Sequence, residues 1–186
     1  PHLPLFTIQY FIGKSAIGEY GYLVMMIDDI VGRINQKLKE IGKYDNTIVM
    51  FAADNGCAGY INMDKINRKG HYPSYIYRGY KSHGWEGGHR IPFILSWGDR
   101  YGHQTDNSLV SLTDLYATFA DMLGYQPGAR EAEDSFSFWP ILNGTGSTTR
   151  TDLIATSGAG YFTYRTPQFK LIFNAGNGSV EEYWIE

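Results

Sequence analysis

The chain has 186 residues and a mass of 21.0 kDa, which suits one domain of ordinary size or one domain with a small addition. Hydrophobic residues make up 43% of it and 22 residues are glycine, so its composition excludes a disordered chain or a coiled coil. The net charge is −3 and no basic stripe marks a nucleic-acid surface. Apolar runs such as Leu23–Ile27 are far shorter than the roughly 20 residues of a membrane span.

The single cysteine, Cys57, excludes an intramolecular disulfide and a zinc site made of cysteines alone. The chain opens Pro1-His2-Leu3-Pro4, without an initiator methionine, a signal peptide or a transit sequence. A processed chain or a fragment begins in this way.

The first half of the sequence predicts a long helix between residues 19 and 41 and two strands. The helix is amphipathic, because its apolar side chains recur every three or four residues: Leu23, Ile27, Ile30, Ile34, Leu38 and Ile41. Thr47–Ala53 and Ile91–Trp97 are short apolar runs without alternation, which predicts strands buried on both faces, as in a parallel sheet. Between them lies a long polar and aromatic-rich segment, and such segments in compact domains are usually functional.

The second half predicts one helix and a small antiparallel sheet. The helix spans Thr113–Leu123, with Ser111 or Thr113 as N-cap and Gly124 as its stop. Turn residues separate four short strands, expected at Leu153–Thr156, Gly160–Arg165, Phe169–Asn174 and Val180–Ile185. The predicted fold is therefore α/β, with helices on a mostly parallel sheet over residues 1–150 and the start of an antiparallel β subdomain over residues 151–186.

Asp54-Asn55-Gly56 follows the first predicted strand directly. Ligands of open α/β sheets bind just outside the carboxyl ends of strands. A carboxylate and an amide oxygen are hard donors that suit Ca²⁺ or Mg²⁺. The same three residues are also good turn formers, so a plain turn is the alternative.

A glycine-rich segment over residues 77–92 carries Arg78, Lys81, His83, His89 and Arg90. Cations and imidazoles separated by glycines can surround a tetrahedral oxyanion. The alternative is a surface loop with solvated charges, in which Glu86 and Arg90 form an internal ion pair.

Several of these pieces occur in one order that resembles the type I sulfatase family of the alkaline phosphatase superfamily. The pieces are Pro1-His2-x-Pro4, Tyr20-Gly21 with Asp28 and Val31-Gly32 on the first helix, residues 45–56, Lys81 with residues 86–92, and residues 111–118. The resemblance covers roughly residues 1–145, and the tail fits the small C-terminal sheet of that family.

The resemblance implies a set of site residues. Asp54 and Asn55 match part of a divalent-metal site, usually calcium, with magnesium as the second option. Lys81 matches a lysine that contacts the sulfate and the nucleophile. His2 matches a histidine that binds the sulfate or protonates the leaving alcohol, and the role of general acid stays open between His2 and Lys81. These roles are physically reasonable, since cations and donors stabilise the charge of a sulfuryl group in transfer.

One departure from the family is equally clear. Its nucleophile is a formylglycine made inside a C-x-[PA]-x-R motif, whereas Cys57 is followed by Ala58-Gly59-Tyr60-Ile61. The chain therefore resembles the C-terminal part of a sulfatase, and the formylglycine is expected in an N-terminal part that is missing. Such a chain should be inactive alone, and its uncovered apolar surface should cause self-association or require the missing half.

The implied function is hydrolysis of sulfate esters of a carbohydrate or a small alcohol, in a periplasmic or secreted enzyme, or a lysosomal one in a eukaryote. The aromatic-rich segment is the expected specificity region, with His71 and Arg78 as substrate-binding candidates. Two alternatives remain. One is a phosphatase or phosphonate hydrolase of the same superfamily, and the other is a non-catalytic binding or structural fragment.

Overall fold

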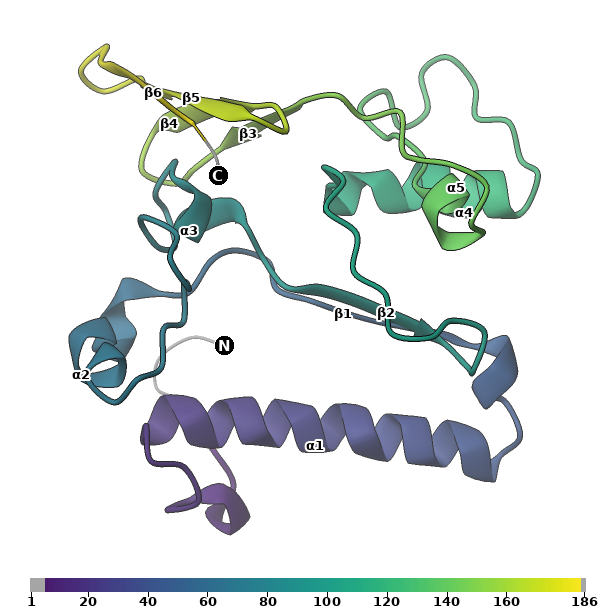
Figure 1. Cartoon of the computed structure of the whole chain (residues 1–186), viewed down its shortest axis with the longest axis horizontal. Coiled ribbons are helices and arrows are strands. Elements are labelled where there is room, and N and C mark those ends of the chain that lie inside the picture. The colour runs from purple at the N-terminus through teal and green to yellow at the C-terminus, as the bar shows by residue number, and fades with distance from the viewer. Residues whose placement is uncertain (1–5, 185–186) are drawn as a thin grey trace. The chain divides into compact units, whose positions relative to one another are not determined.

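A computed structural model describes residues 6–184 of the chain. The chain forms two compact units, Pro1–Gln104 and Thr105–Glu186 (Figure 1). Both helices and strands are present, so the predicted α/β class is confirmed. The boundary predicted at residue 150 falls inside the second unit and stays a prediction.

The first unit combines one long helix, several short helices and a two-stranded sheet. In chain order its elements are η1 (Gln9–Phe11), α1 (Glu19–Glu40), η2 (Tyr44–Asn46), β1 (Ile48–Ala52), η3 (Gly59–Ile61), α2 (Met63–Asn67), α3 (Glu86–His89) and β2 (Phe93–Trp97). Helix η2 contacts both α1 and β2, and so joins the helix to the sheet. The short elements η3, α2 and α3 lie in a segment that the sequence predicted to be irregular, because none of them is long enough to show a helical period.

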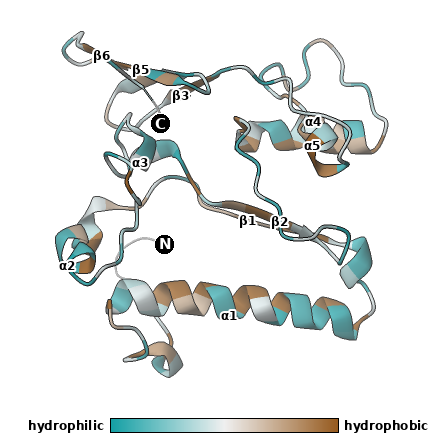
Figure 2. Ribbon diagram, viewed as in Figure 1, coloured by the Kyte–Doolittle hydropathy of each residue, from teal (hydrophilic) through white to brown (hydrophobic). Residues whose placement is uncertain are grey.

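Helix α1 begins and ends within one residue of its predicted limits. Gly42, in the left-handed region with φ 64°, follows the end of the helix as expected. The predicted apolar stripe is covered only in part: Leu23 is 6% exposed, but Ile30 and Ile34 are 44% and 47% exposed. Apolar and polar bands alternate along the helix in Figure 2.

The two predicted strands are present, but they pair with each other in antiparallel fashion. Ile48 of β1 lies opposite Trp97, and Ala52 lies opposite Phe93. Every pairing of named strands in the described part of the chain is antiparallel, so the predicted parallel sheet is not visible there. The strands are half-buried rather than fully buried, and Ile94 is 61% exposed. Each strand has only one strand neighbour among the described residues.

The second unit places three short helices before a four-stranded sheet. The helices are η4 (Leu112–Asp114), α4 (Leu115–Met122) and α5 (Trp139–Leu142). Ser111 caps η4, and its side chain and that of Asp114 form a capping box. Asp114 is fully buried and lies 2.7 Å from the guanidinium Nη2 of Arg150, so this ion pair ties residue 150 to the helix.

The C-terminal sheet has the order β3-β4-β5-β6, with antiparallel neighbours throughout. Its strands are β3 (Leu153–Thr156), β4 (Tyr161–Arg165), β5 (Phe169–Asn174) and β6 (Val180–Trp184), close to the predicted ranges. Thr163 and Ile172 lie opposite each other and are buried, whereas Phe162 and Phe173 beside them are exposed. This alternation is what a sheet covered on one face requires.

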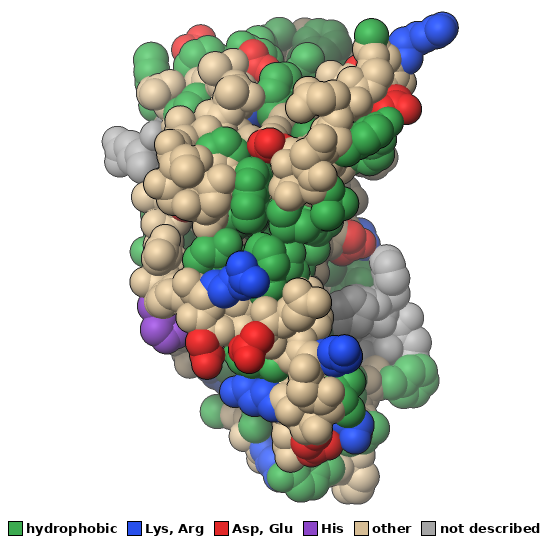
Figure 3. Space-filling view, turned by 90° about the vertical axis from the view of Figure 1, so that its right-hand side faces the viewer, with side chains coloured by type: hydrophobic (Ala, Val, Ile, Leu, Met, Phe, Trp, Pro, Cys, Tyr) green, Lys and Arg blue, Asp and Glu red, His purple; other side chains and the backbone are tan. Residues whose placement is uncertain are grey.

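Among the described residues, no helix combines the length and the apolar character that a membrane span needs. Hydrophobic side chains nevertheless reach the surface in several places (Figure 3).

Candidate functional site

Backbone hydrogen bonds join the two segments that the sequence singled out. The Gly56 nitrogen donates to the Gly88 oxygen at 2.9 Å, and the Lys81 nitrogen donates to the Cys57 oxygen at 2.8 Å. The Gly87 nitrogen donates to the Arg78 oxygen at 2.9 Å. The loop after β1, residues 78–83 and helix α3 therefore form one cluster, which we call the loop cluster.

Glycines allow this close approach. A Cβ atom on Gly56 would lie 1.8 Å from the Gly87 oxygen, and one on Gly87 would lie 2.2 Å from the Gly79 oxygen. No side chain fits at these distances, so the loop cluster requires glycine at both positions. From the sequence, Gly56 suggested only a sharp turn; the structure shows that it is needed for contact with a segment thirty residues further along the chain.

Asp54 and Asn55 lie immediately after β1, where a ligand was expected. The Asn55 amide nitrogen donates to the Asp54 carboxylate at 2.6 Å, and Asp54 is exposed. Both side chains offer hard oxygen donors, which fits a calcium or magnesium ion. Within residues 6–184 no group of three or more His, Cys, Asp or Glu side chains is arranged to hold a metal, so these two residues supply only part of a coordination sphere. The metal site stays a prediction.

Lys81 is half-buried and is followed by a strained turn. Ser82 has φ 76°, a value that non-glycine residues seldom adopt. The His83 ring then packs against Tyr80 and Trp85, with ring centroids 4.1 and 5.0 Å away. Its Nδ1 is buried without a hydrogen-bond partner among the described atoms. The turn fixes the backbone of Lys81 beside the loop after β1, while its catalytic role stays a prediction.

Glu86 and Arg90 form the internal ion pair that was the alternative for this segment. Glu86 Oε2 lies 3.8 Å from Arg90 Nη1, and the Arg90 nitrogen donates to the Glu86 oxygen. The Glu86 side chain is only 8% exposed, so this pair stabilises α3 rather than offering free charges to a ligand.

The predicted substrate-binding residues lie in different surroundings. The Arg78 guanidinium stacks over the Trp85 ring, 3.9 Å from its centroid, within the loop cluster. His71 instead packs on Tyr20 of α1, with ring centroids 5.7 Å apart. His2 lies outside the described residues. The backbone of Lys81 and of Arg78 thus contacts the loop cluster directly, and Asp54 lies two residues before Gly56 in the same loop. The roles of these three residues stay predictions.

A Tyr20–Cys57 contact was missed from the sequence. The Tyr20 hydroxyl donates a hydrogen bond to the Cys57 sulfur, and burial raises the pKa of Tyr20 to about 12. Burial also raises the pKa of the Cys57 thiol. Cys57 is therefore a neutral thiol at ordinary pH, and it packs rather than reacts. The only signal in the sequence was Tyr20-Gly21 among the family-like pieces.

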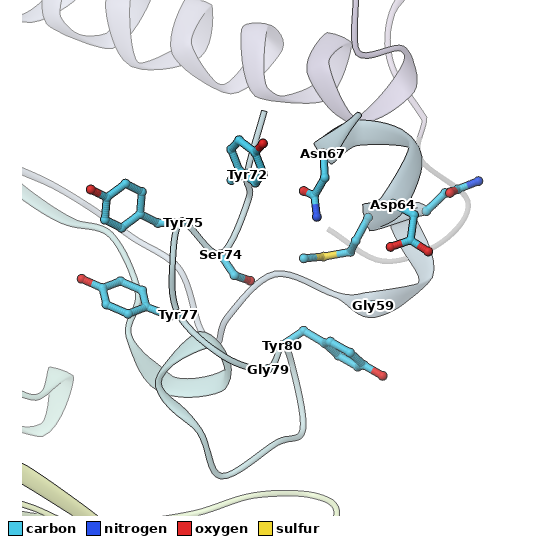
Figure 4. Close-up of a pocket in the computed structure, with 11 residues that line it drawn as sticks. Gly59, Asp64, Asn67, Tyr72, Ser74, Tyr75, Tyr77, Gly79 and Tyr80 are labelled. Atoms are coloured by element: carbon cyan, nitrogen blue, oxygen red, sulfur yellow. The ribbon is translucent and has the colours of Figure 1, made fainter. Parts of the chain in front are cut away.

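A pocket of about 450 Å³ opens in the aromatic-rich segment (Figure 4). Its lining residues are Gly59, Asn62, Met63, Asp64, Asn67, Tyr72, Ser74, Tyr75, Tyr77, Gly79 and Tyr80. Tyr80 is the neighbour of Lys81 in the chain, so one wall of the pocket continues into the loop cluster. Neither His71 nor Arg78 belongs to the lining.

Comparisons with known proteins agree on one family. The model of the Sulfatase family matches residues 1–125. The N-acetylgalactosamine-6-O-sulfatase of Bacteroides thetaiotaomicron is 31% identical over 188 residues, which cover 100% of this chain and 37% of that protein. The human N-acetylgalactosamine-6-sulfatase is 32% identical over 142 residues, covering 76% of this chain and 26% of that protein.

Solved structures give the same result. A Bacteroides thetaiotaomicron structure from work on the metabolism of multiple glycosaminoglycans superposes with a TM-score of 0.85 at 28% identity, covering 98% of this chain and 42% of that one. The structure of Ps i-CgsB, at 24% identity with a TM-score of 0.74, shares the fold over 98% of this chain and 41% of its own. The chain thus spans less than half the length of these relatives.

Proposed function

Since the chain belongs to the sulfatase family, we propose that it is the C-terminal part of an enzyme that hydrolyses sulfate esters of a carbohydrate. The observation that carries this proposal is the 2.8 Å hydrogen bond from the Lys81 nitrogen to the Cys57 oxygen. It holds a lysine within the same cluster as Asp54 and Asn55. A sulfuryl group in transfer needs positive charge, which the lysine supplies and which a metal ion held by these oxygens would add.

Each side chain has a distinct role in this proposal. Lys81 binds a sulfate oxygen and stabilises the negative charge that develops during transfer. Asp54 and Asn55 would hold calcium, or magnesium, which would supply a second positive charge to the sulfate when bound. His2 or Lys81 donates the proton that the leaving alcohol needs.

The nucleophile lies elsewhere in the complete enzyme. The family's formylglycine motif does not occur in these 186 residues, and Cys57, as a half-buried neutral thiol, does not replace it. We therefore expect the chain alone to be inactive, and the complete enzyme to be periplasmic, secreted or lysosomal.

The test is sulfate release by a full-length protein that contains this chain. With N-acetylgalactosamine 6-sulfate and p-nitrophenyl sulfate as substrates, we expect turnover that falls at least about 100-fold in Lys81→Ala. Lys37→Ala is the matched control, because this lysine is exposed on α1 and pairs only with Glu40. Release of phosphate from phosphate monoesters, without release of sulfate, would favour the phosphatase alternative. A full-length protein that hydrolyses neither class of ester would favour the non-catalytic alternative.

A further inference from the structure

The pocket in the aromatic-rich segment has two chemically different sides. Tyr72, Tyr75 and Tyr77 come from the loop after α2, and Asp64 and Asn67 come from α2 itself (Figure 4). Its volume of about 450 Å³ falls within the range of small-molecule sites. The lining combines aromatic rings that have polar tips with amide and carboxylate groups, and this combination suits a ligand with an apolar face and several hydroxyl groups.

Ser74 offers this ligand an unused polar atom. Ser74 lines the pocket, and its hydroxyl oxygen is buried and has no hydrogen-bond partner among the described residues. Buried polar groups are nearly always paired, and those without a partner call for an explanation. A ligand hydroxyl or amide in the pocket would supply the missing partner.

The backbone of the pocket is strained at two lining residues. Asn62 has φ 60° and Tyr75 has φ 51°, in the left-handed region. For a bulky residue such a value is an outlier, and backbone strain of this kind concentrates at ligand sites. Tyr75 is 69% exposed, so burial of its ring does not explain the strain. Presentation of the ring to a ligand would explain the strain at Tyr75.

The charge of the pocket restricts the ligand further. Of the lining residues, Asp64 is the one charged side chain, and the described lining contains no lysine, arginine or histidine. A sulfate or carboxylate would meet a negative charge there without a cation to balance it. Hydroxyl and amide groups can donate to Asp64 instead.

We propose that this pocket binds an uncharged pyranose ring, the sugar that neighbours the sulfated one in the substrate. This inference rests on the proposed function, because it assumes that the sulfated sugar lies at the loop cluster. The chain connects the two places directly, since Tyr80 lines the pocket and Lys81 follows it. Gly59, which also lines the pocket, is two residues after Cys57 in the chain. The Cys57 oxygen accepts the hydrogen bond from the Lys81 nitrogen.

The test is a titration of the 186-residue chain with N-acetylgalactosamine and with N-acetylgalactosamine 6-sulfate. Binding is measured by calorimetry and by saturation-transfer NMR. We expect millimolar binding of the neutral sugar that weakens about fivefold to tenfold in Tyr75→Ala and in Ser74→Ala, the loss of one contact each. Tyr10→Ala is the matched control, because Tyr10 is 65% exposed in the same unit but lies outside the pocket.

Asp64→Lys tests the charge argument at an exposed position. It should turn the preference of the pocket toward the sulfated sugar. The inference is wrong if the neutral sugar gives no saturation transfer, or if Tyr10→Ala weakens binding as much as Tyr75→Ala. It is also wrong if the sulfated sugar binds the unaltered chain more tightly than the neutral sugar and this binding is lost in Tyr75→Ala.

The two proposals can fail separately. Sugar binding that depends on Tyr75, in a full-length protein that releases no sulfate, would refute the proposed function alone. Sulfate release with an unchanged KM in Tyr75→Ala, together with no binding of the neutral sugar, would refute this inference alone.

Discussion

The α-carbon of Gly56 faces the carbonyl oxygen of Gly87 so closely that a Cβ on Gly56 would lie 1.8 Å from that oxygen. The atom in the way belongs to the backbone, so it cannot turn aside as a flexible side chain could. The Gly56 nitrogen is also hydrogen-bonded, to the Gly88 oxygen. The loop after β1 and helix α3 are therefore held at a separation that only glycine permits.

Gly56→Ala should separate these two segments. Overpacking of this kind costs about 1–3 kcal/mol, which lowers the midpoint of thermal unfolding by several degrees in a unit of this size. Gly32→Ala is the control, since it lies inside α1 with nothing within 4 Å of its Cβ position, and should stabilise the chain by about 1 kcal/mol. Equal midpoints for both variants in calorimetry would contradict the role given to Gly56.

Much of the fold could be predicted from the sequence, because local patterns decide it. The spacing of Leu23 and the other apolar residues of its stripe predicts α1, and the turn residues between short segments predict the strands of the C-terminal sheet. The antiparallel pairing of β1 with β2 could not be predicted, since an apolar strand reveals its burial but not the direction of its neighbour.

The candidate site could be predicted in its residue types but not in its contacts. Asp54 and Lys81 were selected by chemistry and by family resemblance. The hydrogen bond from Lys81 to Cys57, the Tyr20–Cys57 pair and the strain at Tyr75 depend on residues far apart in the chain or on backbone angles. No periodic pattern of residues in the sequence predicts such contacts or backbone angles.

Calcium should bind weakly, or not at all, to the isolated chain. Ca²⁺ takes about six to eight oxygen ligands, and Asp54 with Asn55 supplies a small share of them. Calorimetric titration with calcium chloride should therefore show no micromolar binding, whereas chelation should inactivate a full-length enzyme. Micromolar affinity in the chain, lost in Asp54→Ala, would mean that the site is completed within these 186 residues.

Arg150→Met should destabilise the second unit by about 3–5 kcal/mol, because it leaves the fully buried Asp114 carboxylate without its cation. Arg33→Met is the control: Arg33 pairs with Asp29 at 3.9 Å on the exposed surface of α1, and such pairs contribute under about 1 kcal/mol. Urea unfolding of both variants measures the difference. If their midpoints shift by the same amount, the Asp114–Arg150 pair does not anchor α4.

Stability should fall as the pH rises from about 10 to 12. Burial raises the pKa of Tyr20 from 10.0 to about 12, so in this window the unfolded chain has released the phenolic proton while the folded chain keeps it. The unfolded state is then favoured as the pH increases, by linkage. The free energy of unfolding, measured with a chemical denaturant, should depend on pH with a different slope in the wild-type chain and in Tyr20→Phe over this window. Equal pH dependence of the two unfolding free energies would show that burial does not raise the pKa of Tyr20.

The isolated chain should associate through apolar surface on α1 and the β1–β2 sheet. Ile30, Ile34 and Ile94 are 44%, 47% and 61% exposed, although their sequence pattern predicts burial. Exposed apolar patches and uncovered strand edges promote association. Light scattering should detect oligomers or aggregates, and a dye for hydrophobic surface should bind.

Replacing Ile30 and Ile34 together by lysine should reduce both signals. The control is the same change at Asp28 and Arg33, which are polar and exposed on the same helix, and it should reduce neither signal. A wild-type monomer that binds no dye would show that the chain covers its own core.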